Sequence, residues 1–194
     1  MNNLNDFKLA LKADLFRNFG EVRVGIATKL FNGRYKFFFL FRLCQFLYAN
    51  RQNGIISKLL YRLGLFFYDR VQRRFCVEIE PRTKIGRGLF LPHLNGIVLN
   101  PDVIIGDNCT ILHQVTIGNN IFKGLNSLAV IGDNVQISAG AKIIGPCKIG
   151  SNVVIGANSV VTKNISDNQV VAGVPSMVLS DKVSSIYNEY LVGE

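Results

Sequence analysis

Cysteine is scarce in this sequence. The 194 residues include four cysteines, and no two of them have the spacing of a metal-binding or disulfide motif. Cys109 and Cys147 fall on apolar positions of a repeat, and Cys44 lies in an apolar, helix-like stretch, so we expect small buried side chains at all three. Cys76 has no evident partner. This usage predicts neither a bound metal nor a disulfide framework, and it favours a reducing cytoplasm.

Long apolar runs are missing as well. The two most apolar stretches, Tyr35–Ala49 and Ile55–Phe75, are interrupted by basic residues, and neither approaches the roughly 20 apolar residues that cross a bilayer. The amino-terminal residues are mixed polar and have no cleavage-like site after an apolar run, which argues against a signal peptide. We therefore expect a cytoplasmic protein, either free or peripheral on the inner face of the cell membrane.

Acidic residues are rare in the first part of the chain. Residues 1–76 contain 14 Lys+Arg and 4 Asp+Glu (14 − 4 = +10), whereas residues 77–194 contain 8 and 9 (8 − 9 = −1), which together give +9. Twelve of the 14 Phe also fall in 1–76. This composition predicts a basic, aromatic α-helical region, with a helix at 4–19 and then a helical hairpin that turns at Asn53-Gly54.

Two uses of this basic region stay open. Its surface either packs within the protein and its oligomer or lies on an anionic membrane. Because no nucleic-acid-binding module is recognisable, we expect no nucleic-acid partner.

The sequence does contain a six-residue repeat. From 131 to 161 every sixth residue is a large aliphatic: Ile131, Ile137, Ile143, Ile149, Ile155 and Val161. Smaller side chains follow the first five of them at a distance of four residues: Val135, Ala141, Cys147, Val153 and Ser159. A period of six fits neither an α-helix nor the alternation of a plain strand. It is typical of a parallel β-helix, in which hexapeptide units stack and point their large aliphatics into a shared core.

The repeat extends backward across two interruptions. Leu91 and Leu99 are eight residues apart, which indicates two extra residues between them. Ile117 and Ile131 are fourteen apart, two units plus two, so we expect a loop to leave the coil within 119–130. Interruptions of a solenoid put irregular backbone on its surface, where binding loops usually lie. We predict three parts: a helical region at 1–76, a β-helix domain at 77–179 and a tail or short helix at 180–194.

The chain has 2 histidines, His93 and His113. They are twenty residues apart, and removing the two inserted residues leaves eighteen, one turn of three hexapeptides. The two side chains should therefore stack on the same edge of the coil. A single histidine in a strand is usually structural, but His93 adjoins an interruption. The carboxylates one turn before it are Glu78 and Glu80, and a carboxylate bonded to one imidazole nitrogen leaves the other free to act as a general base.

Five motifs resemble the catalytic domain of serine acetyltransferase and its hexapeptide acyltransferase relatives. They are KIGRGLFLPHLNGIV at 84–98, ILHQVTIG at 111–118, ISAGAKIIG at 137–145, IGANSVVTK at 155–163 and VAGVP at 171–175. The resemblance implies a left-handed parallel β-helix, assembly into a homotrimer and acetyl-CoA as the acetyl donor, without a metal.

The resemblance also implies roles for individual residues. His93 corresponds to the general base, and Glu78 takes the place of its partner aspartate. His113 and Asn95 are candidate contacts for the substrate. The cofactor positions correspond to Ala139, Ala157, Thr162 and Lys163.

Three positions depart from the serine enzyme. There, an aspartate precedes the histidine and an Arg–His pair in the following loop grips the substrate carboxylate; here those positions hold Pro92, Ser127 and Leu128. Without a cation for the carboxylate, we expect poor selection of serine. The segment ADLFRNFG at 13–20 and the aromatic, basic stretch after it resemble the leader of enzymes from capsule, lipopolysaccharide and exopolysaccharide clusters.

These departures predict an acetyl-CoA-dependent O-acetyltransferase that acts on a sugar hydroxyl. The expected acceptor is a glycan of a surface polysaccharide or its lipid-linked precursor. Two alternatives remain: a serine O-acetyltransferase of cysteine biosynthesis, and a non-catalytic β-helix scaffold.

Overall fold

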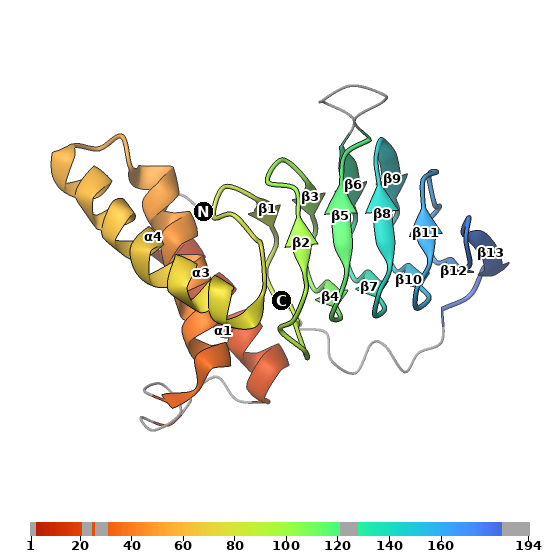
Figure 1. Ribbon diagram of the computed structural model, residues 1–194, viewed down its shortest axis with the longest axis horizontal. Coiled ribbons are helices and arrows are strands. Elements are labelled where there is room, and N and C mark those ends of the chain that lie inside the picture. The colour runs from red at the N-terminus through yellow and green to blue at the C-terminus, as the bar shows by residue number, and fades with distance from the viewer. Residues whose placement is uncertain (1–2, 21–24, 26–30, 121–127, 184–194) are drawn as a thin grey trace.

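The computed structural model describes residues 3–20, 25, 31–120 and 128–183. Three helices lie at one end of the molecule, and a column of short strands extends away from them (Figure 1). The helices are α1 (Leu4–Phe19), α3 (Gly33–Asn50) and α4 (Ile55–Phe75). The predicted helix at 4–19 and the helical hairpin after it are present.

The helices begin and end where the sequence supplies caps. The Asn3 side chain accepts a hydrogen bond from the Asp6 N–H, and Asn32 caps the first turn of α3 in the same way. Helix α1 ends at Gly20 in the left-handed conformation, with φ of 71°. Helix α4 ends at Cys76, which is also left-handed. The turn at Cys76 sends the chain directly into the coil.

The coil has three sides, each a parallel sheet. The first side is β1 (Lys84–Ile85), β3 (Ile104–Ile105), β6 (Ala129–Ile131) and β9 (Cys147–Ile149). The second is β2 (Val98–Leu99), β5 (Thr116–Gly118), β8 (Lys142–Ile144) and β11 (Val160–Val161). The third is β4 (Thr110–Ile111), β7 (Gln136–Ile137), β10 (Val154–Ile155) and β12 (Val170–Ala172), to which β13 (Met177–Ser180) adds an antiparallel strand. The predicted parallel β-helix is confirmed.

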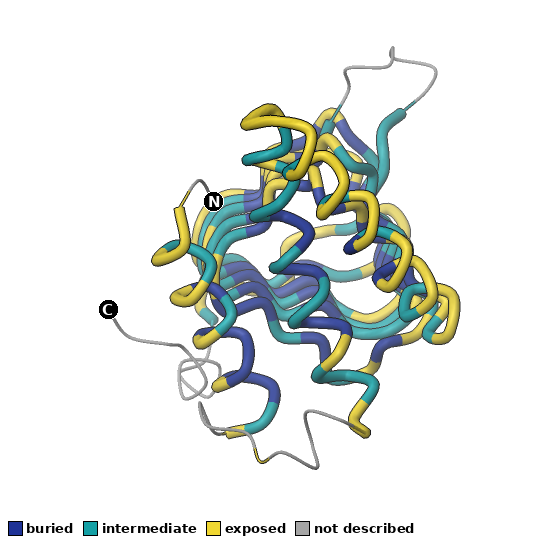
Figure 2. Tube along the Cα trace, turned by 90° about the vertical axis from the view of Figure 1, so that its left-hand side faces the viewer, coloured by how far each residue is buried: buried dark blue, intermediate teal, exposed yellow. Residues whose placement is uncertain are grey.

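The repeat places its aliphatic side chains in columns inside the coil. On one side Ile105 pairs with Ile131 and Ile131 with Ile149, and all three are buried. Figure 2 looks along the coil from the helical end and shows the buried segments of successive turns stacked behind one another. The polar inward residue Ser159 is fully buried, and its hydroxyl accepts a hydrogen bond from the Gly173 N–H at 3.2 Å. The hydroxyl is therefore satisfied inside the coil.

The second interruption is larger than the sequence spacing indicated. Ile131 lies on the side of the coil that directly follows Ile117, because Ile131 pairs with Ile105 and Ile117 pairs with Leu99. A regular step between sides is six residues, so eight residues leave the coil here (14 − 6 = 8). The expectation of two further units plus two was wrong, since the strand register leaves no place for those units. Residues 121–127 of this loop lie outside the described residues.

A buried ion pair joins the helices to the first turn of the coil. Arg42 on α3 donates from Nε to Asp14 Oδ2 on α1 at 2.6 Å, and both side chains are 0% exposed. Arg42 Nη1 also donates to the Ile85 carbonyl at 2.9 Å, and Asp14 Oδ1 accepts from the Leu89 N–H at 2.8 Å. Burial raises the pKa of the Asp14 carboxyl, and the adjacent guanidinium opposes that rise. The pair is thus satisfied mainly by the backbone of the coil.

Further bonds to first-turn carbonyls come from the helical hairpin. The Tyr68 hydroxyl donates to the Ile79 carbonyl at 2.9 Å, and Gln45 Nε2 donates to the Thr83 carbonyl at 2.9 Å. These carbonyls belong to the open end of the coil, where no earlier turn exists to donate hydrogen bonds to them. The hairpin therefore supplies the partners that a preceding turn would otherwise supply.

The cysteines agree with their assignment as small buried side chains. Cys44, Cys109 and Cys147 are buried and Cys76 is exposed. Burial raises the pKa of the thiols of Cys44 and Cys109 to about 12 and that of Cys147 to about 11. These three thiols are protonated near neutral pH and are poor nucleophiles.

We predict that Arg42→Met lowers the free energy of unfolding by about 3–5 kcal/mol, because it leaves the Asp14 carboxylate buried without its partner. Urea denaturation followed by circular dichroism measures the change. The matched control is Arg73→Met, which removes an ion pair to Asp69 whose side chains are 79% and 52% exposed. The control should cost less than about 1 kcal/mol. Equal losses in the two variants would contradict the anchoring role of Arg42.

Candidate active site

The two histidines meet on one edge of the coil, as their spacing predicts. His93 precedes β2 and His113 follows β4. Their ring centroids are 5.5 Å apart, and the ring planes are nearly perpendicular, at 86°. The Nδ1 atom of His113 is buried and has no hydrogen-bond partner within the described residues. His93 is exposed, so its ring can reach a bound substrate.

A cavity of about 500 Å³ opens beside this pair. The coil contributes residues from the first interruption, and the helices contribute the first turn of α3 and the last residue of α4. The lining residues are Arg34, Phe75, Pro92, His93, Leu94, Asn95 and His113. The cavity therefore combines an imidazole pair from the coil with a guanidinium and an aromatic ring from the helices.

Gly33 allows the two helices to meet at this cavity. A Cβ atom on Gly33 would lie 2.8 Å from the Phe75 ring, so the close approach of α3 to the end of α4 depends on the missing side chain. The sequence analysis missed Arg34 and Phe75 as site residues. The available signal was the Asn32-Gly33 pair, which predicts a turn but gives no indication of the coil residues that face it.

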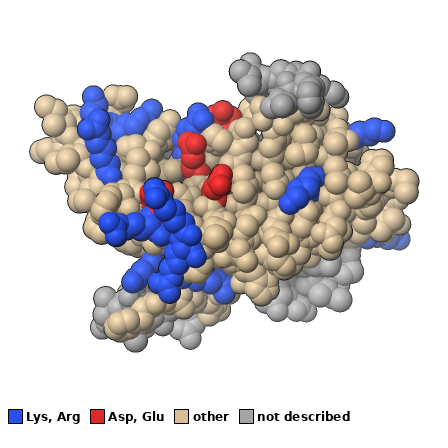
Figure 3. Space-filling view, in the orientation of Figure 1, with Lys and Arg blue, Asp and Glu red and all other residues tan. Residues whose placement is uncertain are grey.

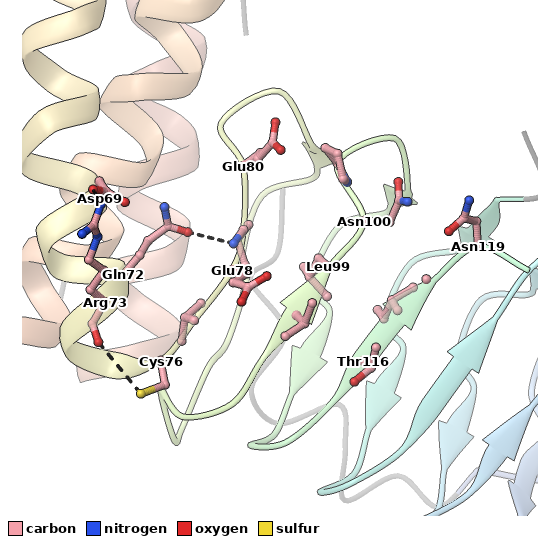
Figure 4. Close-up of a pocket in the computed structure, with 16 residues that line it drawn as sticks. Asp69, Gln72, Arg73, Cys76, Glu78, Glu80, Leu99, Asn100, Thr116 and Asn119 are labelled. Carbon is pink, nitrogen blue, oxygen red and sulfur yellow. Dashed lines mark hydrogen bonds and ion pairs between the residues drawn. The ribbon is translucent and has the colours of Figure 1, made fainter. Parts of the chain in front are cut away.

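The predicted partner of His93 lies in a different groove. Glu78 borders a groove of about 740 Å³ between the last turns of α4 and the strands β2 and β5 (Figure 4). Within the described part of the chain no hydrogen bond joins Glu78 to His93. The other candidate, Glu80, is exposed and accepts a hydrogen bond from Arg82 Nε at 2.9 Å, as expected for a solvated turn residue. The orienting role of Glu78 stays a prediction.

The four residues predicted to contact the cofactor lie along the edges of one sheet. Ala139 and Ala157 precede β8 and β11, and Thr162 and Lys163 directly follow β11. Backbone bonds continue the column from the histidines, because Gly140 N–H donates to the His113 carbonyl and Asn158 N–H donates to the Ala139 carbonyl. Ala139 and Ala157 present small side chains there, and Ala157, Thr162 and Lys163 are exposed. An elongated ligand running along the coil from the cavity would meet Ala139 and Ala157, whereas Thr162 and Lys163 lie at the opposite end of β11.

The remaining predicted contacts are placed as follows. Asn95 is exposed and lines the cavity, and its carbonyl accepts a hydrogen bond from the Gln114 N–H at 2.9 Å. Pro92 lines the same cavity and supplies no carboxylate. Leu128 is half-buried next to β6, and Ser127 lies outside the described residues.

The family comparison agrees with the fold. Residues 128–163 match the family model described as bacterial transferase hexapeptide (six repeats). The matched residues lie in the β-helix, so this part of the chain is similar to hexapeptide-repeat transferases.

Sequence relatives carry a more specific name. The serine acetyltransferase of Buchnera aphidicola is 40% identical over 120 residues, which cover 61% of this chain and 46% of the relative. The serine acetyltransferase of Staphylococcus epidermidis is 39% identical over 136 residues, covering 70% of this chain and 60% of the relative. The chain thus spans about half the length of these curated relatives.

Solved structures with a similar fold are also named serine acetyltransferases. A serine acetyltransferase from Vibrio cholerae superposes with a TM-score of 0.75 at 26% identity, covering 96% of this chain and 70% of that one. One from Brucella abortus in complex with coenzyme A gives 0.72 at 28% identity, covering 93% and 69%. These similarities include the helices as well as the coil.

The comparisons correct the expected function. The relatives are named serine acetyltransferases, and none of those given above is an enzyme of capsule or lipopolysaccharide synthesis. The expectation of a glycan acceptor, and of kinship with polysaccharide O-acetyltransferases, was therefore wrong. The expectation rested on the absence of a cation at Ser127 and Leu128 in the coil sequence. The cavity, however, is lined by a cation from the helical region, Arg34.

Proposed function

We propose that this chain is an acetyl-CoA-dependent O-acetyltransferase and that its acceptor is the hydroxyl of L-serine. The observation that carries the proposal is the exposed His93, packed edge-to-face against His113 in a cavity at the edge of the hexapeptide coil. An imidazole so placed can accept a proton from a hydroxyl bound in the cavity. Similarity to serine acetyltransferases over 70% of the chain supports the choice of acceptor.

The transfer needs a base and no covalent enzyme intermediate. His93 removes the proton of the acceptor hydroxyl as its oxygen attacks the thioester carbonyl carbon. The tetrahedral intermediate then expels the CoA thiolate, and the imidazolium of His93 gives the proton to this leaving group. Direct transfer agrees with the cysteines, because three thiols are buried and protonated and Cys76 borders the other groove.

Acetyl-CoA would lie along the edge of the β2–β5–β8–β11 sheet. Ala139 and Ala157 leave room for close approach of a ligand, and the exposed ammonium of Lys163 suits the phosphates of the cofactor. When bound, the cofactor supplies the activated acetyl group.

A homotrimer is part of the proposal. Outward-facing Ile104 and Val130 are adjacent in register on the β1–β3–β6–β9 sheet and are 41% and 39% exposed. Apolar residues paired on a sheet face suit contact with another copy. We predict that sedimentation equilibrium gives a mass of three chains of 21.6 kDa. A mass equal to one chain at micromolar concentration would contradict it.

For the reaction, we predict that His93→Ala lowers kcat at least about 10²-fold, because the hydroxyl proton loses its acceptor. Release of CoA thiol from acetyl-CoA with L-serine as acceptor measures the rate. Gln114→Ala is the matched control, since Gln114 is exposed on the same edge and does not line the cavity. Near-normal turnover by His93→Ala would refute its role as base. A wild-type protein that binds acetyl-CoA and does not turn over L-serine would refute the acceptor, and one that does not bind acetyl-CoA would favour a non-catalytic scaffold.

We also propose peripheral contact with an anionic membrane, at the inner face of the cell membrane, through helix α4. Among the described helices, none is long and apolar enough to cross a bilayer. However, α4 exposes an apolar stripe: Ile55, Ile56, Leu59, Leu60, Leu63, Phe66 and Phe67. Basic residues Lys58, Arg62 and Arg70 accompany the stripe, and Figure 3 shows Lys and Arg gathered over the helical end. Such a face suits the headgroup region of an anionic bilayer.

We predict that vesicles containing phosphatidylglycerol bind the protein and that neutral phosphatidylcholine vesicles do not. Binding should fall when salt is raised from about 0.05 to 0.5 M, because screening weakens the attraction between exposed charges. Arg62→Glu should weaken co-sedimentation, whereas Lys182→Glu, with the same change in net charge, should leave it unchanged. Binding that is independent of lipid charge and salt would contradict the proposal.

A further inference from the structure

Arg34 is a cation that lines the cavity and has no acidic partner among the described residues. Its Nη2 donates to Asn18 Oδ1 at 3.1 Å, and its guanidinium carbon lies 5.7 Å from the centroid of the Phe19 ring. Its Nε is buried and has no hydrogen-bond partner within the described residues. Burial lowers the pKa of this guanidinium.

The buried guanidiniums of Arg42 and Arg17 have more hydrogen-bond partners. Arg42 is paired with Asp14 at 2.6 Å, and Arg17 donates to the carbonyls of Gly88 and Cys109. Arg34 forms no ion pair with any carboxylate in the described ranges. A half-buried guanidinium without an anion carries a desolvation penalty that an incoming anion would relieve.

A second polar atom on the same cavity also lacks a partner. Nδ1 of His113 is buried and unbonded, and His113 lines the cavity together with Arg34 and Asn95. Native structures satisfy the great majority of their buried polar atoms, so two unsatisfied nitrogens at one cavity indicate a site whose ligand completes the hydrogen bonding. The charge of Arg34 favours a ligand that includes an anionic group.

The planar guanidinium favours one class of anion. A carboxylate can accept two parallel hydrogen bonds from it, an arrangement that adds geometric selectivity to the charge attraction. The cavity of about 500 Å³ fits a small molecule, and Phe75 and Leu94 give it apolar walls. A small carboxylate held at Arg34 would place the rest of the molecule beside the exposed ring of His93.

We propose that Arg34, assisted by His113, binds the carboxylate of the amino-acid acceptor and thereby determines acceptor specificity. This inference rests on the proposed function, because it assigns the acceptor of that same site. Helix α3, and not the coil, then supplies the cation that selects an amino acid over a neutral alcohol. Arg34 is a binding residue here, and the proton transfer remains with His93.

The test compares a carboxylate ligand with its neutral analogue. Dissociation constants of L-serine and L-serinamide are measured by calorimetry for the full chain, with and without CoA, which cannot donate an acetyl group. Arg34→Gln should weaken L-serine binding about 10- to 100-fold and leave L-serinamide unchanged, because only the carboxylate loses a charge-assisted pair. The affinity of Arg34→Lys for L-serine should lie between those of the wild type and Arg34→Gln. Lysine keeps the positive charge but cannot donate two parallel hydrogen bonds to the carboxylate. Lys36→Gln, an exposed cation on the same helix, should bind both ligands as the wild type does.

Each outcome separates this inference from the proposed function. If Arg34→Gln weakens the binding of L-serine and L-serinamide equally, or changes the binding of neither ligand, Arg34 has a structural role and the inference fails. It also fails if the wild type binds no L-serine with or without CoA. If the wild type binds L-serine through Arg34 and does not acetylate it, the proposed reaction fails and the carboxylate site stands. Where turnover is measurable, Arg34→Gln should raise KM for L-serine and leave kcat within about 3-fold, because the base is untouched.

Discussion

The buried pair between Asp14 and Arg42 is the interaction on which the arrangement of the molecule depends. A parallel coil must begin somewhere, and its first turn exposes backbone carbonyls that no earlier turn can satisfy. Here α1 and α3 insert two opposite charges that bond to each other and to that backbone. Burying the charges is costly, and the cost is offset only when every partner is in place. The helices are consequently fixed in one orientation relative to the coil.

That orientation creates the candidate active site. Figure 1 shows the helices lying across the start of the coil, and the cavity opens where the start of α3 and the end of α4 approach the first interruption. The coil controls spacing along its axis, so the two histidines stack one turn apart. The helices add a guanidinium and an aromatic ring that the coil lacks. The proposed base and the proposed acceptor-binding group therefore come from different parts of the chain.

The sequence predicted the features that are periodic. The six-residue repeat predicted the β-helix, and the interval between His93 and His113 predicted their stacking, because strand register converts sequence distance into spatial distance. The sequence could not predict the contacts between the helices and the coil, because these contacts follow no period. Arg34 lies far from His93 in the chain, and no period relates the two, so the cavity's cation was missed and the acceptor was assigned to the wrong class. Glu78 was placed by motif alone, and its side chain borders another groove. The eight-residue interruption was misread because fourteen residues also suggest whole repeat units.

The antiparallel pairing of β13 with β12 has a consequence for the far end of the coil. A parallel coil that ended in a bare strand would offer its edge to the first turn of another copy, and identical copies could then add without limit. At this end, β13 reverses direction and covers β12. At the opposite end, the helices already occupy the carbonyls of the first turn. With β12 covered at one end and the first-turn carbonyls bonded at the other, the coil is less able to add further copies end to end.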